Sequence, residues 1–124
     1  MSHFTRVKTK IVELLYLKRA LKDLNLQFDE GKVKIRGFMG KKTAVDLRIR
    51  TPEGYDVGFV KVGDSYEVVA DWEMVRSFSK EAFVKELSRR YAYHVVKEQL
   101  QAQDFAVVEE RRQGESVSLT LRRT

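Results

Sequence analysis

The stretch from residue 54 to residue 72, GYDVGFVKVGDSYEVVADW, sets the architecture of the chain. It contains two runs rich in β-branched and aromatic residues, Tyr55–Val62 and Ser65–Trp72, a composition typical of strands. Gly63-Asp64 lies between them and is a two-residue signal for a tight turn. The sequence therefore predicts an antiparallel β-hairpin at the centre of the chain.

Two helices are expected, one on each side of this hairpin. Apolar residues recur at three- and four-residue steps over residues 10–24, as in an amphipathic helix, with Asn25 as its stop. Ser79 is a helix N-cap residue, and the segment after it predicts a long helix to about residue 103. Further strands are predicted at residues 4–8, 26–28, 33–35 and 44–50, and at 105–110 and 116–122, with turns at Asp29-Glu30-Gly31 and Gln113-Gly114-Glu115.

The order strand–helix–strands–helix–strands is typical of an α+β protein. We expect a mostly antiparallel sheet with two helices on one face. The order also allows a duplicated strand–helix–hairpin unit, although the two halves share no visible sequence identity. A chain of 124 residues with no linker is expected to form a single domain, residues 1–124.

Composition narrows the class of protein. Hydrophobic residues make up 43% of the chain and charged residues 34%, as in ordinary soluble proteins. Cysteine is absent, which excludes disulfides, thiolate metal sites and a cysteine nucleophile. There is neither an apolar run of roughly 20 residues nor an N-terminal signal peptide. A soluble, intracellular protein is expected.

The net charge of +6 is concentrated in one region. Residues 1–62 carry 14 Lys and Arg against 7 Asp and Glu, whereas residues 63–124 carry 10 against 11. Most of the excess lies between residues 32 and 50, where Asp46 is the only acidic residue. We call the cations of this segment the basic patch: Lys32, Lys34, Arg36, Lys41, Lys42, Arg48 and Arg50. Such a patch attracts acidic partners.

The loop at residues 37–43, GFMGKKT, is not a Walker loop. Ile35 stands where the first glycine is required, and Lys41 is followed by Lys42 and not by Ser or Thr. A solvated basic loop is the favoured interpretation. The alternative is an anion site built from backbone amides.

Catalytic patterns are weak. The two histidines, His3 and His94, lack metal-ligand spacing, and His94 is expected to face the sheet as a hydrogen-bonded core residue. Asp71 and Glu73 have the spacing of paired carboxylates, but acidic residues at a strand end are ordinary. No Ser-His-Asp order is present. We predict neither an enzyme, nor a cofactor, nor a metal site.

Aromatic residues give two candidate contacts. Trp72, the only tryptophan, is either a core or rim residue with its N–H satisfied or an anchor in a partner interface. On the second helix, Tyr91 falls on the apolar stripe and Tyr93 lies roughly 160° away. Tyr91 is therefore expected inside, with Arg90 and Tyr93 outside or against another element.

Four segments, in this order, resemble a single family: Met1-Ser2-His3-Phe4, Gly54–Phe59, Tyr66–Trp72 and Arg90-Tyr91-Ala92-Tyr93-His94. It is the small protein of cyanobacteria and algal plastids called hypothetical chloroplast reading frame thirty-five, a domain of unknown function. The resemblance implies a cyanobacterial cytosol or plastid stroma, and no activity. The family often has a second aromatic residue and a glycine after the tryptophan, whereas Glu73 and Met74 follow here.

Two functions remain open. The favoured one is a non-enzymatic protein-binding or assembly module of a photosynthetic cell, with Trp72, Arg90 and Tyr93 contacting an unidentified protein. The alternative is binding of RNA or another nucleic acid through the basic patch, with Phe38 available to stack a base. An anionic membrane is the least favoured acceptor, because no helix combines a basic face with a strongly apolar one.

Overall fold

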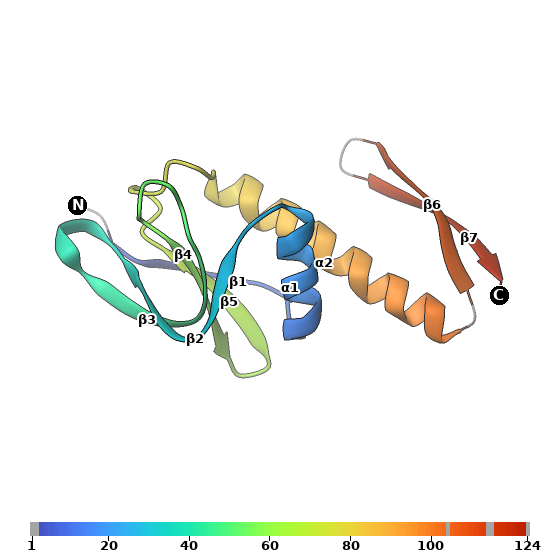
Figure 1. The fold of residues 1–124 in the computed structure, drawn as a ribbon, viewed down its shortest axis with the longest axis horizontal. Coiled ribbons are helices and arrows are strands. Elements are labelled where there is room, and N and C mark those ends of the chain that lie inside the picture. The colour runs from blue at the N-terminus through green and yellow to red at the C-terminus, as the bar shows by residue number, and fades with distance from the viewer. Residues whose placement is uncertain (1–2, 104, 114–115, 124) are drawn as a thin grey trace. The chain divides into compact units, whose positions relative to one another are not determined.

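The computed structural model describes residues 3–103, 105–113 and 116–123, which form two compact units (Figure 1). The first unit spans residues 1–91 and the second residues 92–124, and each is described by itself. The first contains β1 (Thr5–Lys8), α1 (Leu14–Asp23), β2 (Phe28–Arg36), the short helix η1 (Phe38–Gly40), β3 (Lys42–Ile49), β4 (Val57–Val62) and β5 (Ser65–Ala70). Helix α2 (Lys80–Ala102) begins in the first unit and continues into the second, which also holds β6 (Phe105–Gln113) and β7 (Ser116–Arg123).

The first unit is built on a five-stranded sheet in the order β1-β5-β4-β3-β2, with every neighbouring pair antiparallel. The β4–β5 hairpin lies at its centre, with Gly63-Asp64 between the strands as predicted. The α+β class is therefore confirmed. The duplicated unit is not confirmed: within the described residues, β6 and β7 pair with each other in a separate two-stranded sheet. Two residues of their predicted turn, Gly114 and Glu115, lie outside the described residues.

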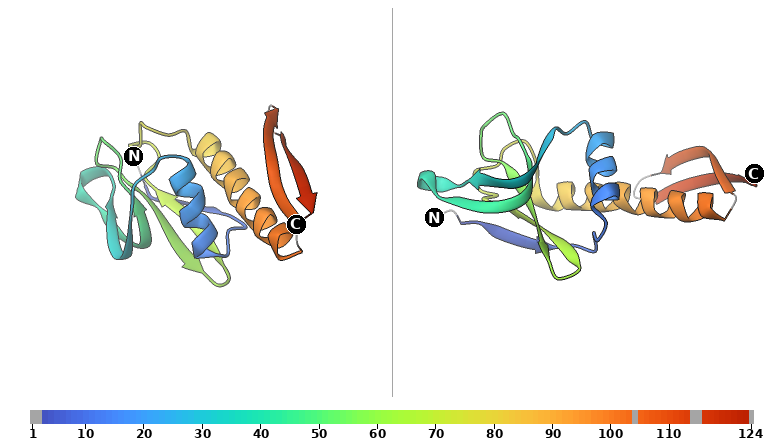
Figure 2. Two further views of the ribbon diagram at one scale, coloured as in Figure 1. Left: turned by 45° about the vertical axis from the view of Figure 1, so that its right-hand side comes forward. Right: turned by 60° about the horizontal axis from the view of Figure 1, so that its bottom comes forward.

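The main core lies between the helices and one face of the sheet (Figure 2). Leu47, Phe59 and Val68 are cross-strand neighbours, so their side chains share that face, and all three are fully buried. Leu17, Ala20 and Leu21 of α1 and Phe83, Leu87 and Tyr91 of α2 are buried with them. The amphipathic stripes of the sequence are the faces that the two helices bury.

Two local expectations are wrong. Helix α1 begins at Leu14 and not near residue 10, because Ile11 is buried in extended chain, where its carbonyl accepts the N–H of Tyr66 at 2.8 Å. The segment around Gly31 is not a turn between two strands. It is a bulge inside the single strand β2, between Glu30 and Val33, with Gly31 at a φ of +99°.

The opposite face of the sheet is partly covered by the β2–β3 hairpin itself. Gly58 and Val69 are cross-strand neighbours on that face, and Val69 is buried in a cluster with Ile35 and Val45 of the hairpin. Gly58 makes this approach possible, because a Cβ there would lie only 2.4 Å from Val45 Cγ1. The hairpin thus bends back over the sheet and carries the basic patch with it.

Candidate functional site on the β2–β3 hairpin

The hairpin brings four cations of the basic patch to the edge of one hollow of about 450 Å³. Lys34 and Arg36 come from β2, and Lys42 and Arg48 from β3. Ile35, Gly54 and Asp56 complete the lining. We call this feature the cationic hollow.

Arg36 is held in place by the loop between β3 and β4. Its guanidinium carbon lies 4.5 Å from the centre of the Tyr55 ring, in a cation–π contact. Gly54, at a φ of +81°, leaves room for this arrangement, since a Cβ there would lie 3.2 Å from Arg36 Nη2. The stack keeps the guanidinium in a fixed position while its N–H groups remain available.

Arg48 and Arg50 share one carboxylate, that of Asp29, which faces them from β2. Asp29 Oδ2 accepts hydrogen bonds from Arg48 Nη2 at 2.8 Å and from Arg50 Nε at 2.7 Å. The bonds from Arg50 and then Arg48 lower the pKa of Asp29, and Asp29 in turn raises the pKa of Arg50. Arg48 also donates to the backbone oxygen of Lys34 at 3.1 Å, so it stiffens the floor of the hollow.

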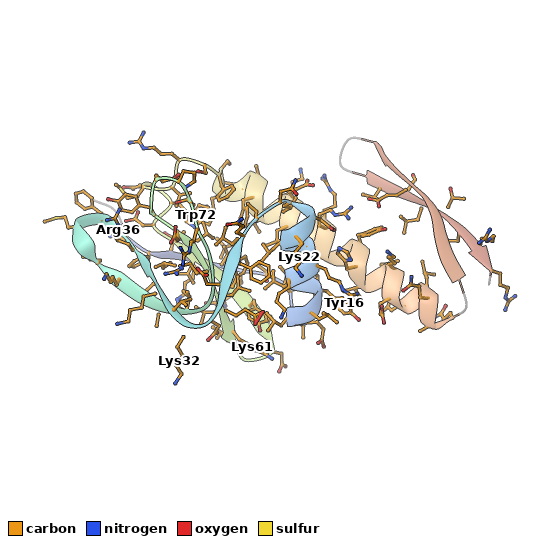
Figure 3. The ribbon with its side chains drawn as sticks, in the orientation of Figure 1. Tyr16, Lys22, Lys32, Arg36, Lys61 and Trp72 are labelled. Carbon is orange, nitrogen blue, oxygen red and sulfur yellow. The ribbon has the colours of Figure 1, made fainter. Side chains whose placement is uncertain are left out.

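The remaining cations of the patch differ in their surroundings. Lys34, Arg36 and Lys42 are exposed, and none makes an ion pair with any residue that the structure describes. Lys32 projects into solvent from β2 and does not line the hollow (Figure 3). Lys41 is exposed at the end of the hairpin. Arg50 lines an adjoining depression of about 290 Å³ that shares Arg48, Gly54 and Asp56 with the hollow.

The loop that supplies Gly54 and Asp56 is fixed at two points. Asp56 Oδ1 accepts the backbone N–H of Thr51 at 2.8 Å. Glu53 accepts the backbone N–H groups of Arg76 and Ser77 at 2.7 and 3.0 Å, and the Ser77 hydroxyl at 2.7 Å. Burial alone would raise the pKa of Glu53, but these hydrogen bonds together lower it to about 2.

The tip of the hairpin, residues 38–42, exposes two large apolar side chains beside Lys41 and Lys42. Phe38 is 39% exposed and Met39 is 82% exposed. Met39 adopts a left-handed backbone conformation (φ 57°, ψ 35°), which is uncommon for a residue other than glycine. The tip therefore presents apolar and cationic groups together.

Asp71 anchors this tip to the end of β5. Its buried Oδ2 accepts the backbone N–H of Phe38 at 2.9 Å. Gly37 is required next to it, because a Cβ there would lie 2.8 Å from Phe4 Cζ and 3.2 Å from Asp71 Oδ2. The ordinary role expected for an acidic residue at a strand end is thus replaced by a specific one, the positioning of a loop.

Trp72 is half-buried next to the helices. Its ring lies 6.2 Å from that of Phe83, which also contacts the rings of Phe78 and Phe59 at 5.0 and 6.5 Å. The indole Nε1 is buried and has no hydrogen-bond partner among the described residues. This position corresponds to a rim residue, but without the satisfied N–H that the core interpretation requires.

Arg90 and Tyr91 join α2 to the two ends of α1. The guanidinium of Arg90 donates to Asp23 Oδ2 at 2.6 and 3.1 Å. The hydroxyl oxygen of Tyr91 accepts the backbone N–H groups of Val12 and Glu13 at 3.0 and 2.9 Å. Tyr91 lies inside as predicted, and Arg90 lies against another element, namely α1.

Tyr93 and His94 belong to the second unit and are half-buried. Their rings meet edge to face with centres 5.2 Å apart, and Lys97 Nζ lies 5.9 Å from the centre of the Tyr93 ring. Within the ranges that the structure describes, no group of three or more His, Cys, Asp or Glu residues is placed to hold a metal ion. None of the helices in those ranges is long and apolar enough to cross a membrane.

Sequence reasoning found the cations of the hollow but missed the residues that arrange them. Tyr55 and Asp56 were predicted as the start of the strand Tyr55–Val62, and with Gly54 they open a segment shared with the resembling family. Neither pattern indicated that they border the hollow. Asp71 was considered as one of two paired carboxylates, whereas its contact is with a backbone amide 33 residues earlier in the chain. Contacts over such separations leave no periodic signal in a single sequence.

Comparison with known proteins places the chain among relatives. A family model described as "Protein of unknown function (DUF1257)" matches residues 20–121. The uncharacterized protein ycf35 of Cyanophora paradoxa is 34% identical over 113 residues, covering 89% of this chain and 87% of the relative. Those of Guillardia theta and Pyropia yezoensis are 32% and 33% identical, each covering 99% of this chain and 98% of the relative. No solved structure matches the chain.

Proposed function

The chain belongs to this family of proteins of unknown function, DUF1257, and we propose that it is a non-enzymatic protein-binding module of a photosynthetic cell. The docking point is the tip of the β2–β3 hairpin. The observation that carries the proposal is Met39, a large apolar side chain that is 82% exposed on a loop fixed by a buried carboxylate.

An exposed apolar residue is not unusual by itself. The tip is distinguished by its rigidity, since the Phe38 amide is bound by Asp71 and the Gly37 N–H donates to the Lys41 oxygen at 2.7 Å. A pre-organised loop loses little conformational entropy when it binds. The left-handed conformation of Met39 is the kind of local strain that is often found at ligand clamps.

The charges of the hairpin define the partner. Lys41 and Lys42 flank the two apolar side chains, and interfaces pair such cations with acidic groups that steer the encounter. Met and aromatic residues are enriched at the centre of interfaces. The partner is therefore a protein with an apolar socket for Met39 and carboxylates at its rim. A contribution of Trp72 and Tyr93 to the same function remains a prediction, while Arg90 is already engaged with Asp23.

The test is affinity capture of the tagged chain from cells that encode it. The variant F38S/M39S removes the apolar part of the tip. The control L15S/V62S removes two other exposed apolar side chains of the first unit, which are 51% and 46% exposed. Capture is carried out at low salt with nuclease and read by mass spectrometry.

We expect at least one protein that survives nuclease, is lost with F38S/M39S and is retained with L15S/V62S. Identical sets of captured proteins from the two variants would refute the docking role of the tip. Partners that disappear on nuclease treatment would instead favour the nucleic-acid alternative.

A further inference from the structure

We propose that the cationic hollow is a binding site for the phosphate group of a small phosphorylated molecule. This site shares Lys42 with the tip but does not use Phe38 or Met39, and it does not depend on the protein partner proposed above. It rests on three observations: the unbalanced charge of the hollow, the fixed position of Arg36, and the shape of the space between the cations.

The like charges around the hollow repel one another and so destabilise the pairing of β2 with β3. Arg36 and Lys42 stand directly opposite each other on β2 and β3, a placement of like charges that destabilises a strand pair. Lys34 adds a third cation with no ion-pair partner among the described residues. Asp56 is the only carboxylate among the described residues of the lining. Its Oδ1 accepts the Thr51 amide and its Oδ2 lies 3.9 Å from Arg48 Nε, so it does not face Lys34, Arg36 or Lys42 with an ion pair. A bound dianion would remove this repulsion.

Arg36 is positioned before any ligand arrives. Its guanidinium carbon lies 4.5 Å from the centre of the Tyr55 ring, and Gly54, which has no side chain, leaves room for this contact. The planar fork of arginine matches two phosphate oxygens at once, whereas lysine acts as a point charge. Arg36 thus supplies direction, and Lys34 and Lys42 supply additional charge.

The shape favours a small molecule over a nucleic-acid strand. A volume of about 450 Å³ lies within the usual range of ligand pockets, roughly 300–1,000 Å³. The cations converge on one space, whereas proteins that hold single strands spread them along a groove with aromatic faces for the bases. No aromatic residue is among the described residues that line the hollow, and the ring of Tyr55, between Gly54 and Asp56, is in contact with Arg36.

The experiment uses the full chain and two probes, inorganic phosphate and pyrophosphate. Binding is measured by calorimetry and by amide chemical shifts in ¹⁵N spectra, with potassium chloride keeping the ionic strength constant. We expect saturable binding, tighter for pyrophosphate, with the largest shifts at Lys34–Arg36 and Gly54–Asp56. Shifts that chloride reproduces at the same ionic strength would overturn the proposal.

Two pairs of variants test the location of the site. Because Arg36 and Lys42 would each donate charge-assisted hydrogen bonds to the anion, R36A/K42A should weaken pyrophosphate binding about tenfold or more. K8A/K10A removes the same charge from two exposed lysines outside the hollow and should change the affinity less than about twofold. R36K keeps the charge and the fold but loses the fork, and it should weaken binding by several-fold. Equal losses in R36A/K42A and K8A/K10A would refute a specific site.

Two further measurements distinguish this proposal from the docking role of the tip and from nucleic-acid binding. F38S/M39S should bind pyrophosphate normally, so that a failure of the tip hypothesis leaves this one intact. An RNA of about 20 nucleotides without a terminal phosphate should bind wild type no more tightly than R36A/K42A. Tighter RNA than pyrophosphate binding that falls steeply with salt would overturn the small-molecule site in favour of a nucleic-acid surface.

Discussion

On the helical face of the first unit, Arg90 and Tyr91 both make hydrogen bonds to other residues of the chain. On the hairpin face, Arg36 and Tyr55 form a cation–aromatic pair, and Arg36 stays exposed. The guanidinium of Arg90 is matched by the carboxylate of Asp23. The guanidinium of Arg36 has no carboxylate opposite it, because its cross-strand neighbour is Lys42.

An arginine and a tyrosine therefore stabilise the fold on one face and remain available for binding on the other. The difference lies in the charge of the groups that face the arginine. The polar groups of Arg90 and Tyr91 each meet a complementary group, which is the usual condition of a stabilising contact. At the cationic hollow the cations meet one another, which is the usual condition of a binding surface that is completed by a ligand. We call the contacts of Arg90 and Tyr91 with α1 the helix clasp.

The largest expected effect is a loss of stability where the β2–β3 hairpin packs against Gly58. Gly58→Ala would place a Cβ 2.4 Å from Val45 Cγ1, and overpacking of this kind costs about 1–3 kcal/mol in the free energy of unfolding. Urea denaturation measures the loss. Amide shifts should change over residues 33–45 and remain unchanged in α1, because the helix clasp is on the other face.

A second substitution tests this cause. Val45→Ala removes the clashing methyl groups, so the double variant G58A/V45A should lose less stability than the sum of the two single variants. If the stability losses of the two single variants simply add, the contact between Gly58 and Val45 is not the cause of the loss in Gly58→Ala. The substitution would then not be a test of the hairpin face alone.

The next effect is at the helix clasp. Tyr91→Phe leaves the amides of Val12 and Glu13 without their acceptor, which should cost about 1–2 kcal/mol of unfolding free energy. Pyrophosphate binding should not change. Tyr16→Phe is the control, because it alters a ring that packs against Tyr91 at 6.4 Å without touching these amides. A reduced affinity for pyrophosphate in Tyr91→Phe would contradict the independence of the two regions.

A smaller effect links pH to the loop of the hollow. The pKa of Glu53 is about 2 in the folded protein and 4.5 without these contacts. A lowered folded pKa means that the stabilisation is complete above about pH 4.5 and is lost as the pH falls towards 2. Glu53→Gln should therefore lose less stability than wild type between about pH 5 and pH 2.5, measured by urea midpoints. Parallel curves for the two proteins would show that Glu53 does not hold this loop.

The sequence predicted the central hairpin, the helices and the antiparallel sheet because these depend on local periodicity and turn residues. Gly63-Asp64 and the apolar stripe of α1 each act within a few positions. Gly31 was misread for the same reason, since a glycine with positive φ suits both a turn and a bulge. The pairing of β2 with β3 on both sides of Gly31 makes this position a bulge and not a turn.

The candidate site could be predicted only in part. Lys34, Arg36 and Lys42 stand out because an excess of charge is visible in composition. Their convergence depends on the register of the β2–β3 pair, which places Arg36 opposite Lys42, and composition carries no information about that register. Arg48 and Arg50 looked equally available, but both donate hydrogen bonds to Asp29, which stands opposite Arg48 on β2.

The smallest expected effect is on stability at the hollow. Lys42→Ala should change the unfolding free energy by less than about 0.5 kcal/mol, or raise it, because the repulsion from Arg36 across the strands is removed. Arg90→Ala, which leaves Asp23 without this partner at the helix clasp, should by contrast lose up to about 1 kcal/mol in the same urea titration. A loss for Lys42→Ala as large as that for Arg90→Ala would mean that the hollow's cations also stabilise the fold. The contrast between a face completed internally and a face completed by a ligand would then fail. A neutral or stabilising result, together with weaker pyrophosphate binding, would show that Lys42 is kept for binding at no benefit to the fold.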